Sequence, residues 1–169
     1  MSEVVLYIID AEKYFEGLVS ILKNSNAKKE IIYVTTNKPY KNIMDILNKR
    51  KIKIKKVFFI DCISRHIGDK LGVEPDNCIF IEGPQNLTTL SIAINEAVKR
   101  LSGNKVLLLD SLSTLLLYND ARTIGQFTNF FINKMRAADV ETIMLALESD
   151  VDKDVIKQIQ SFSDKVKKV

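Results

Sequence analysis

Short apolar runs alternate along this chain with stretches of helical period, and this alternation narrows the fold more than any other feature. Six apolar runs have the length of buried strands and fall at residues 4–9, 31–35, 57–60, 78–81, 106–109 and 140–147. Apolar residues three or four positions apart predict helices over 11–23, 39–47, 87–101, 121–138 and 151–162, and a last short strand is predicted at 165–169. The pattern predicts an α/β fold with a mainly parallel, doubly wound sheet and helices on both faces.

Length and composition predict a single domain over residues 1–169. The chain is 46% hydrophobic and has no linker rich in Gly, Ser or Pro. Its longest apolar runs are too short to cross a bilayer. The first residues lack the basic start of a signal peptide, and Cys62 and Cys78 are too few for a disulfide scaffold. These features predict a cytoplasmic protein that makes no contact with a membrane.

Acidic residues follow several of the predicted strands, most clearly Asp110 after the apolar run 106–109. A parallel sheet collects the carboxyl ends of its strands at one edge, where ligands bind. Asp10, Asp61 and Asp110 are therefore predicted to lie along that edge. One interpretation is a magnesium or phosphoryl-transfer site with Asp110 as the candidate metal ligand. The favoured interpretation is that each residue caps the helix that follows it, with Ser111 beside Asp110.

No segment has the pattern of a loop that cradles phosphate groups. The motif Gly-x-x-x-x-Gly-Lys-Ser/Thr does not occur in the sequence. The turn after the first strand, residues 10–13, has no glycine and carries two acids, which would repel a pyrophosphate. Residues 83–89 lack a second glycine and a lysine, and Pro84 offers no amide donor. We therefore expect no phosphate cradle.

A basic stretch precedes the third predicted strand. Its charged members are Lys49, Arg50, Lys51, Lys53, Lys55 and Lys56. Isoleucines alternate with the lysines, as in a half-buried strand or the approach to one. The stretch could bind nucleic acid through phosphates. A solvated face is the favoured interpretation, because no aromatic residue is interleaved for base stacking.

The predicted helix over 121–138 carries more large apolar side chains than one face can bury. Phe130, Phe131 and Ile132 are the candidates for a protein-contact surface, and packing on two sides is the equal alternative.

The segment 105–116, Lys-Val-Leu-Leu-Leu-Asp-Ser-Leu-Ser-Thr-Leu-Leu, resembles the Walker B region of RecA-type ATPases. It is most similar to the KaiC-like branch common in archaea. Segments 127–135 and 143–150 continue the resemblance, and 58–62 and 86–94 are also similar to parts of such proteins. The resemblance implies a RecA-like, P-loop NTPase-like three-layer sandwich, with Asp110 at the position of the magnesium ligand.

The sequence departs from this family where catalysis occurs. Residues 10–13 stand where the glycine-rich loop should follow the first strand, and Thr36-Asn37-Lys38 stand where the catalytic acidic pair would fall. Only residues 1–3 precede the first strand, where the family has its oligomerising segment. The sequence thus lacks the phosphate cradle, its lysine and magnesium-binding hydroxyl, and the water-activating acid, all of which stabilise the transition state in this family. We therefore expect a pseudo-ATPase without catalytic residues or a required cofactor.

The favoured interpretation is therefore a degenerate RecA/KaiC-like domain that acts as a regulatory or signalling module through protein partners. We expect a monomer or a small symmetric dimer. The first alternative is a module that binds ATP or ADP with magnesium, or another anion, without hydrolysis through Asp110, Ser111, Asp61 and Arg65. The second alternative is nucleic-acid binding through residues 49–56.

Overall fold

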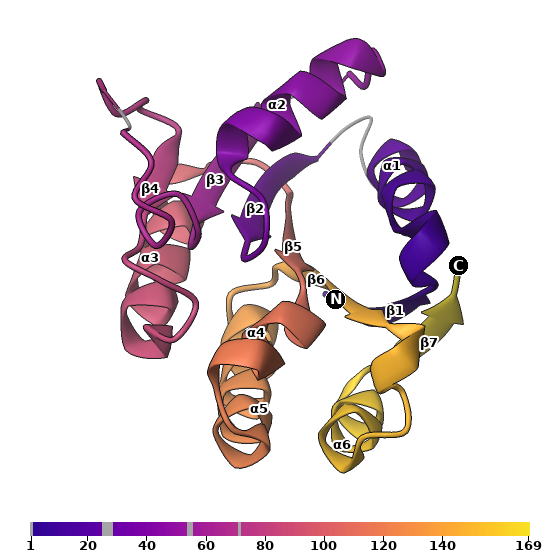
Figure 1. Cartoon of the computed structure of the whole chain (residues 1–169). Coiled ribbons are helices and arrows are strands. Elements are labelled where there is room, and N and C mark those ends of the chain that lie inside the picture. Colours follow the sequence, from indigo (N-terminus) through magenta and orange to yellow (C-terminus); the bar gives the residue numbers. More distant parts are fainter. Residues whose placement is uncertain (1, 25–28, 54–55, 71) are drawn as a thin grey trace.

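All the strands of the described chain belong to one parallel sheet (Figure 1). The computed structural model describes residues 2–24, 29–53, 56–70 and 72–169. Within them, seven strands have the order β4-β3-β2-β5-β6-β1-β7. They are β1 (Val4–Ile9), β2 (Glu30–Thr35), β3 (Lys56–Asp61), β4 (Cys78–Phe80), β5 (Lys105–Asp110), β6 (Glu141–Leu147) and β7 (Lys165–Lys168). Every pairing between neighbouring strands is parallel.

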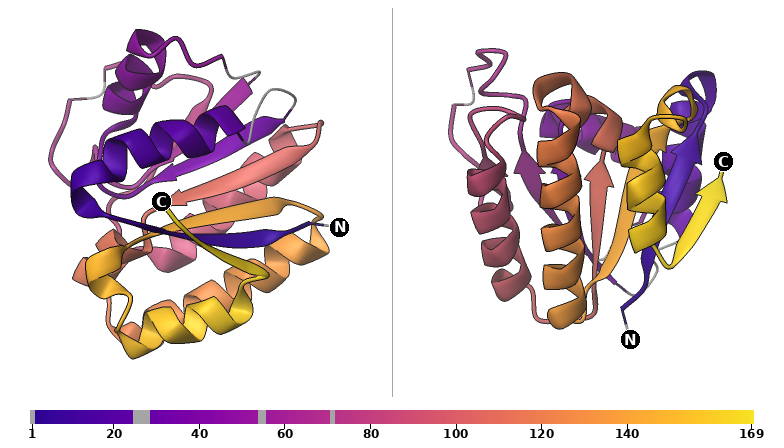
Figure 2. Two further views of the ribbon diagram at one scale, coloured as in Figure 1. Left: turned by 90° about the vertical axis from the view of Figure 1, so that its right-hand side faces the viewer. Right: turned by 90° about the horizontal axis from the view of Figure 1, so that it is seen from below.

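Helices cover both faces of the sheet, so the fold is the predicted three-layer α/β sandwich (Figures 1 and 2). The 3-10 turn η1 (Ala11–Lys13), α1 (Tyr14–Asn24) and α2 (Tyr40–Lys49) lie on one side. On the other side are α3 (Leu87–Arg100), α4 (Leu112–Tyr118), α5 (Ala121–Ala137) and α6 (Asp154–Phe162), with the 3-10 turn η2 (Glu148–Asp150) before α6.

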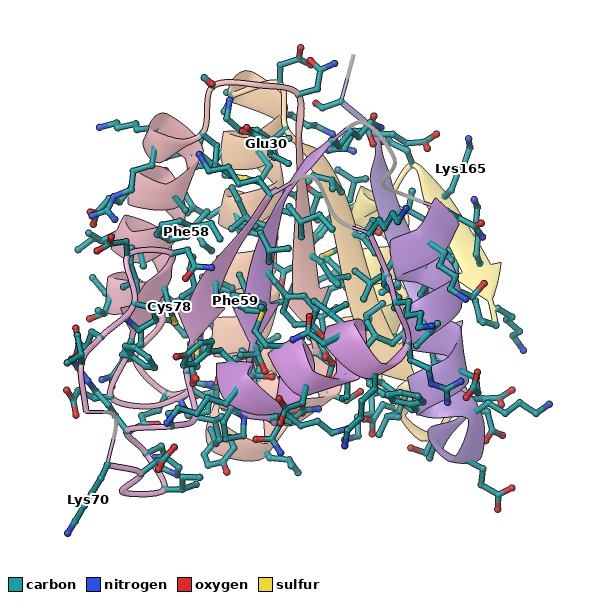
Figure 3. The ribbon with its side chains drawn as sticks, turned by 90° about the horizontal axis from the view of Figure 1, so that it is seen from above. Glu30, Phe58, Phe59, Lys70, Cys78 and Lys165 are labelled. Atoms are coloured by element: carbon teal, nitrogen blue, oxygen red, sulfur yellow. The ribbon has the colours of Figure 1, made fainter. Side chains whose placement is uncertain are left out.

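The two faces of the sheet bury separate apolar clusters. Successive side chains of a strand point to opposite faces, and β3 shows this with two phenylalanines (Figure 3). Phe58 packs into the cluster under α3–α6, whereas Phe59 packs into the cluster under α1 and α2. Burial on both faces explains why the central strands are continuous apolar runs in the sequence.

The path of the chain creates a topological switch point between β2 and β5. From β2 the chain continues through α2 to β3 and β4, toward one end of the sheet. From β5 it continues through α4 and α5, on the opposite face, to β6 on the other side. Thr35 and Asp110 are register partners at the ends of these neighbouring strands. Ligand sites of doubly wound sheets form at such points.

The predicted elements differ from the observed ones mainly at their ends. The first helix starts as η1, and α-helix begins at Tyr14. The helix α4 was not among the predicted helices, although a helix cap was predicted at Asp110 and Ser111, directly before it. The basic stretch is the end of α2 and the approach to β3, and residues 54–55, including Lys55, lie outside the described part.

Two of the three residues proposed for protein contact are buried, which corrects that prediction. Phe131 is 3% exposed and Ile132 is fully buried, whereas Phe130 is 54% exposed. The reason is that α5 packs against the sheet and also against α4 and α6, so it buries a wider face than one apolar stripe. The rings of Phe127 and Phe131 stack within this core. Phe130 alone of the three remains on the surface.

No helix in the described part of the chain combines the length and the apolar character needed to cross a membrane.

Neighbouring phenylalanines on α5 should differ sharply in their effect on stability. Phe131→Ala should lower the free energy of unfolding by about 3–5 kcal/mol, because it opens a cavity in the core. Phe130→Ala should cost no more than about 1 kcal/mol, because the side chain is half exposed. Urea denaturation of both variants measures the difference, and equal costs would contradict this description of α5.

Candidate functional site

Two of the acidic residues predicted for the carboxyl edge of the sheet, Asp61 and Asp110, lie with Thr35 in one row across three strands. Asp110 ends β5 and is the register partner of Thr35 in β2, which is in turn the register partner of Asp61 in β3. The sequence placed both aspartates at strand ends correctly. The row lies at the switch point, so its side chains define the candidate functional site.

Two tyrosine hydroxyls hold the carboxylate of Asp110. Tyr14, the first residue of α1, donates a hydrogen bond to Oδ1, and Tyr33 of β2 donates to Oδ2 at 2.6 Å. Asp110 is 1% exposed and Tyr33 is fully buried. Both carboxylate oxygens therefore have a protein donor, and the carboxylate and Tyr33 are shielded from solvent, whereas Tyr14 is half-buried.

The local sequence explains how the two tyrosines reach Asp110. Asp10 caps η1 by accepting a hydrogen bond from the amide of Glu12 at 2.8 Å, and this short turn leads directly into Tyr14. Tyr33 points to the face of the sheet that α1 and α2 cover. A buried tyrosine hydroxyl needs a partner, and Asp110 supplies one for each ring.

Burial sets the protonation behaviour of this cluster. Removal from water raises the pKa of Asp110, and the hydrogen bonds from Tyr14 and Tyr33 partly counteract that rise. The same burial, with the negative charge of Asp110 as a further cause, raises the pKa of both tyrosines. The tyrosines therefore remain hydrogen-bond donors.

The side chain of Thr36, the residue after β2, joins this strand to the end of β5 beside the cluster. The hydroxyl of Thr36 donates to the carbonyl oxygen of Asp110 and accepts from the amide of Ser111, both at 2.9 Å. The Asp110–Ser111 peptide bond is cis. The side chain of Ser111 accepts from the amide of Thr114 at 3.2 Å and so caps α4. Ser111, not Asp110, is therefore the cap of this helix, because the carboxylate of Asp110 turns toward the tyrosines.

Asp61 has a structural role of a different kind. Its Oδ1 accepts from the amides of Ile63 and Ser64, each at 2.8 Å. Its Oδ2 accepts from the amide of Tyr40 at 2.9 Å and from the hydroxyl of Ser64 at 2.5 Å. Asp61 thus joins the start of α2 to the turn after β3.

Arg65, proposed for anion binding, is engaged by carboxylates. Its guanidinium forms ion pairs with Glu74 at 2.5 Å and Glu82 at 3.1 Å, and lies 5.9 Å from the ring centroid of Phe80. The hydrogen bond to Glu74 is the main cause that raises the pKa of Arg65. An anion at this position would have to compete with two acidic side chains.

The basic stretch runs from the end of α2, beside the start of α1, to the amino end of β3. Arg50 pairs with Glu16 at 2.6 Å and lies 4.9 Å from the ring centroid of Phe15, whereas Lys49, Lys51, Lys53 and Lys56 are exposed. Arg50 thus contacts the two residues that follow Tyr14 in α1, whereas Lys56 lies at the amino end of β3.

Within the described residues, no group of three or more His, Cys, Asp and Glu side chains is arranged to hold a metal ion. Tyr14 and Tyr33 complete the site around Asp110, and neither was predicted from the sequence to be its partner. Tyr33 carried a signal, since it is a hydroxyl-bearing residue inside an apolar strand and therefore needs a buried acceptor.

Comparison with known proteins gives a family but no activity. Residues 21–168 match the model of a family described as a family of unknown function, DUF7504. The chain belongs to this family. No curated protein matches it.

Nineteen solved chains match the structure. One is Thermomonospora curvata EccC (ATPases 2 and 3) in complex with a signal sequence peptide, at 9% identity and a TM-score of 0.49. The match covers 97% of this chain and 30% of the EccC chain, so this chain spans less than a third of that protein's length.

Substitutions at the two neighbouring residues of the site should separate their roles. Ser111→Ala removes a helix cap and should lower the free energy of unfolding by about 1 kcal/mol. Asp110→Ala removes the acceptor of the buried Tyr33 hydroxyl and of the part-buried Tyr14 hydroxyl, and should cost more, at about 1–3 kcal/mol for the Tyr33 hydroxyl alone. Chemical denaturation compares them, and an Asp110→Ala cost no larger than that of Ser111→Ala would show that the tyrosine contacts contribute little.

Stability should depend on pH through Asp110. Its pKa in the folded state is raised above the unfolded value of about 3.9, so its favourable contribution is complete below that pH. The contribution is then lost as pH rises through the folded pKa. The wild-type protein should therefore lose stability relative to Asp110→Asn between about pH 4 and 7. Urea unfolding across this range measures the difference, which a flat or rising trend would contradict.

Proposed function

We propose that this protein is a RecA/KaiC-like domain without ATP hydrolysis, acting as a regulatory or signalling module that binds other proteins. The observation that carries the proposal is the state of Asp110, the Walker B-like aspartate. Both of its oxygens accept hydrogen bonds from tyrosines, and one of these, Tyr14, follows the turn where the resembled family has its phosphate loop.

The chemistry of phosphoryl transfer explains why this arrangement argues against catalysis. In such enzymes the magnesium ion bridges the β- and γ-phosphates and is held by a Walker B carboxylate. A metal ion at Asp110 would have to displace a tyrosine from a carboxylate that is 1% exposed. The turn from Asp10 to Lys13 offers acidic side chains instead of glycine amides, and the Asp10 carboxylate already caps its own turn.

The two alternatives have weaker support from the contacts. Anion binding through Asp110, Ser111, Asp61 and Arg65 would use two buried carboxylates whose oxygens already accept hydrogen bonds, and an arginine that pairs with Glu74 and Glu82. Nucleic-acid binding through residues 49–56 would use the exposed side chains of Lys49, Lys51, Lys53 and Lys56, between the end of α2 and the start of β3. Arg50 in this stretch is already paired with Glu16.

Protein binding has support from the helical layer that α3 and α5 form. Ile92 of α3 is 62% exposed and Phe130 of α5 is 54% exposed, and the two line one groove. Exposed apolar side chains that lie together on one surface often mark an interaction site, whereas single exposed apolar residues are common on any protein. The signalling role rests on the resemblance to KaiC-like proteins.

The proposal predicts no response to nucleotide. A ligand at a hundredfold excess over its dissociation constant stabilises a protein by about 2.7 kcal/mol. For a domain of this size that corresponds to a rise in melting temperature of about 5–11 °C. We expect no such rise with millimolar Mg-ATP or Mg-ADP, and no release of phosphate.

Asp110→Asn is the matched control for this thermal-shift experiment. An effect of ionic strength or free magnesium should be the same in the variant and the wild type. A rise that occurs in the wild type and disappears in Asp110→Asn would overturn the proposal and favour the nucleotide-binding alternative.

A further inference from the structure

A groove runs between α3 and α5 on the outer face of the helical layer. The backbones of α5 and α6 pack closely, whereas those of α3 and α5 stand further apart. The space between them forms an open groove of about 500 Å³, with a small pocket at its base. We call this surface the α3–α5 groove.

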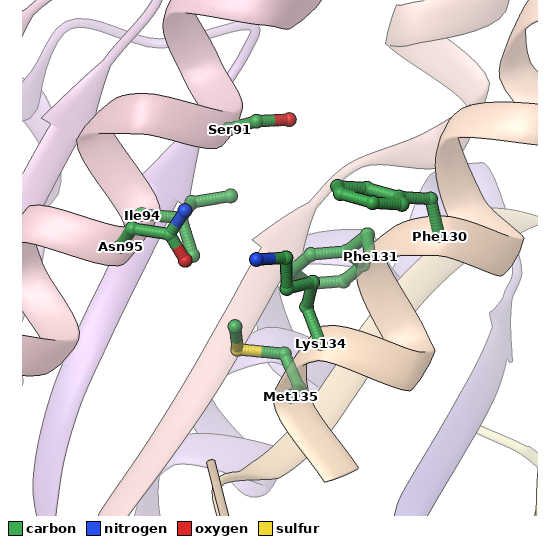
Figure 4. Close-up of a pocket in the computed structure, with 7 residues that line it drawn as sticks. All are labelled: Ser91, Ile94, Asn95, Phe130, Phe131, Lys134 and Met135. Atoms are coloured by element: carbon green, nitrogen blue, oxygen red, sulfur yellow. The ribbon is translucent and has the colours of Figure 1, made fainter. Parts of the chain in front are cut away.

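The α3–α5 groove has an apolar floor and an apolar rim. Ile94, Phe131 and Met135 are buried beneath it. The exposed side chains of Ile92 and Phe130 stand on opposite walls. Figure 4 shows that the side chains of the two helices point toward one another across the gap. A groove of this shape takes up a row of side chains from one face of a helix.

The charge of the groove has one sign. Among the described residues that line it, Lys134 is the one that carries a charge, and the other polar lining residues are neutral. Its ammonium group lies 5.6 Å from the centroid of the Phe130 ring, so the positive charge sits directly beside the apolar rim. No carboxylate lines the groove in the described part of the chain.

This charge argues against a second copy of the chain as the occupant. In a two-fold dimer through the groove, the same patch on each protomer would have to be complementary to itself. Two patches with Lys134 and no acid would instead bring like charges together. A partner that places a carboxylate against Lys134 gains both attraction and correct register.

We propose that the α3–α5 groove docks an amphipathic helix of a partner protein, with apolar residues at helical spacing against Ile92 and Phe130 and an acidic residue against Lys134. This inference rests on the proposed function as a protein-binding module, because it names the surface and the chemistry of the partner.

Two synthetic peptides test the proposal on the whole protein. Each is a stapled helix of about 16 residues with leucines at i, i+4 and i+7, and they differ in one flanking position that is Glu or Lys. Binding is measured by fluorescence anisotropy, and the contact surface by chemical-shift changes of backbone amides. We expect the Glu peptide to bind about twofold to fivefold more tightly, with shifts confined to α3 and α5.

Three variants of the protein supply the controls. Phe130→Glu should weaken binding by about tenfold or more, because it removes the main apolar anchor. Lys134→Glu should reverse the preference in favour of the Lys peptide. Leu117→Glu, on another exposed apolar side chain (78% exposed, on α4), should leave binding unchanged. Melting curves of each variant establish that it is folded.

Several results would overturn the proposal. They are no binding of either peptide, binding that Phe130→Glu leaves intact, a preference that Lys134→Glu does not reverse, or concentration-dependent dimers that Phe130→Glu dissolves. None of these depends on nucleotide. Failure of the groove would therefore be distinguished from failure of the proposed function, which Mg-ATP binding would reveal.

Discussion

The buried carboxylate of Asp110 is the constraint on which the carboxyl edge of the sheet depends. A carboxylate removed from water is costly unless hydrogen bonds compensate for the lost solvation. Tyr14 and Tyr33 supply those bonds, one to each oxygen, and so tie β5 to α1 on one side and to β2 on the other. The same contacts occupy both oxygens of Asp110 at the switch point, which is where this fold class places its ligands. Local stability and the proposed loss of a ligand site therefore have one physical cause.

The sequence allowed the fold to be predicted because local patterns carry it. Apolar runs of strand length and stretches of helical period alternate, and a parallel sheet buried on both faces requires that pattern. The position of Asp110 at a strand end followed from the same pattern. The hydrogen-bond partners of Asp110 could not be predicted from that pattern. Tyr14 and Tyr33 lie 96 and 77 residues away from it in the chain and contact it only in the folded structure.

Two further predictions failed for tertiary reasons. Asp and Ser are both good capping residues, so the sequence could not tell whether Asp110 or Ser111 caps the next helix. In the structure the Asp110 carboxylate points toward the tyrosines, and Ser111 is the cap. Phe131 and Ile132 were proposed for the surface because one helical stripe could not bury them. Packing of α5 against several neighbours buries both, a fact that depends on the arrangement of α4 and α6. The basic stretch was correctly placed next to a strand, and its described lysines are exposed, as either a solvated face or a phosphate-binding surface requires.

The outer helical layer carries the proposed protein-binding surface, where Ile92, Phe130 and Lys134 line one groove. The proposed function requires that Asp110 is inaccessible to metal ions. Paramagnetic broadening of backbone amides by Mn²⁺, added with and without ATP, tests this most directly, with Mg²⁺ as the diamagnetic reference. The account predicts that the amide signals of Leu109, Asp110 and Ser111 keep their intensity relative to the rest of the sheet. Selective loss of these signals at Mn²⁺ concentrations that leave β7 unaffected would contradict it.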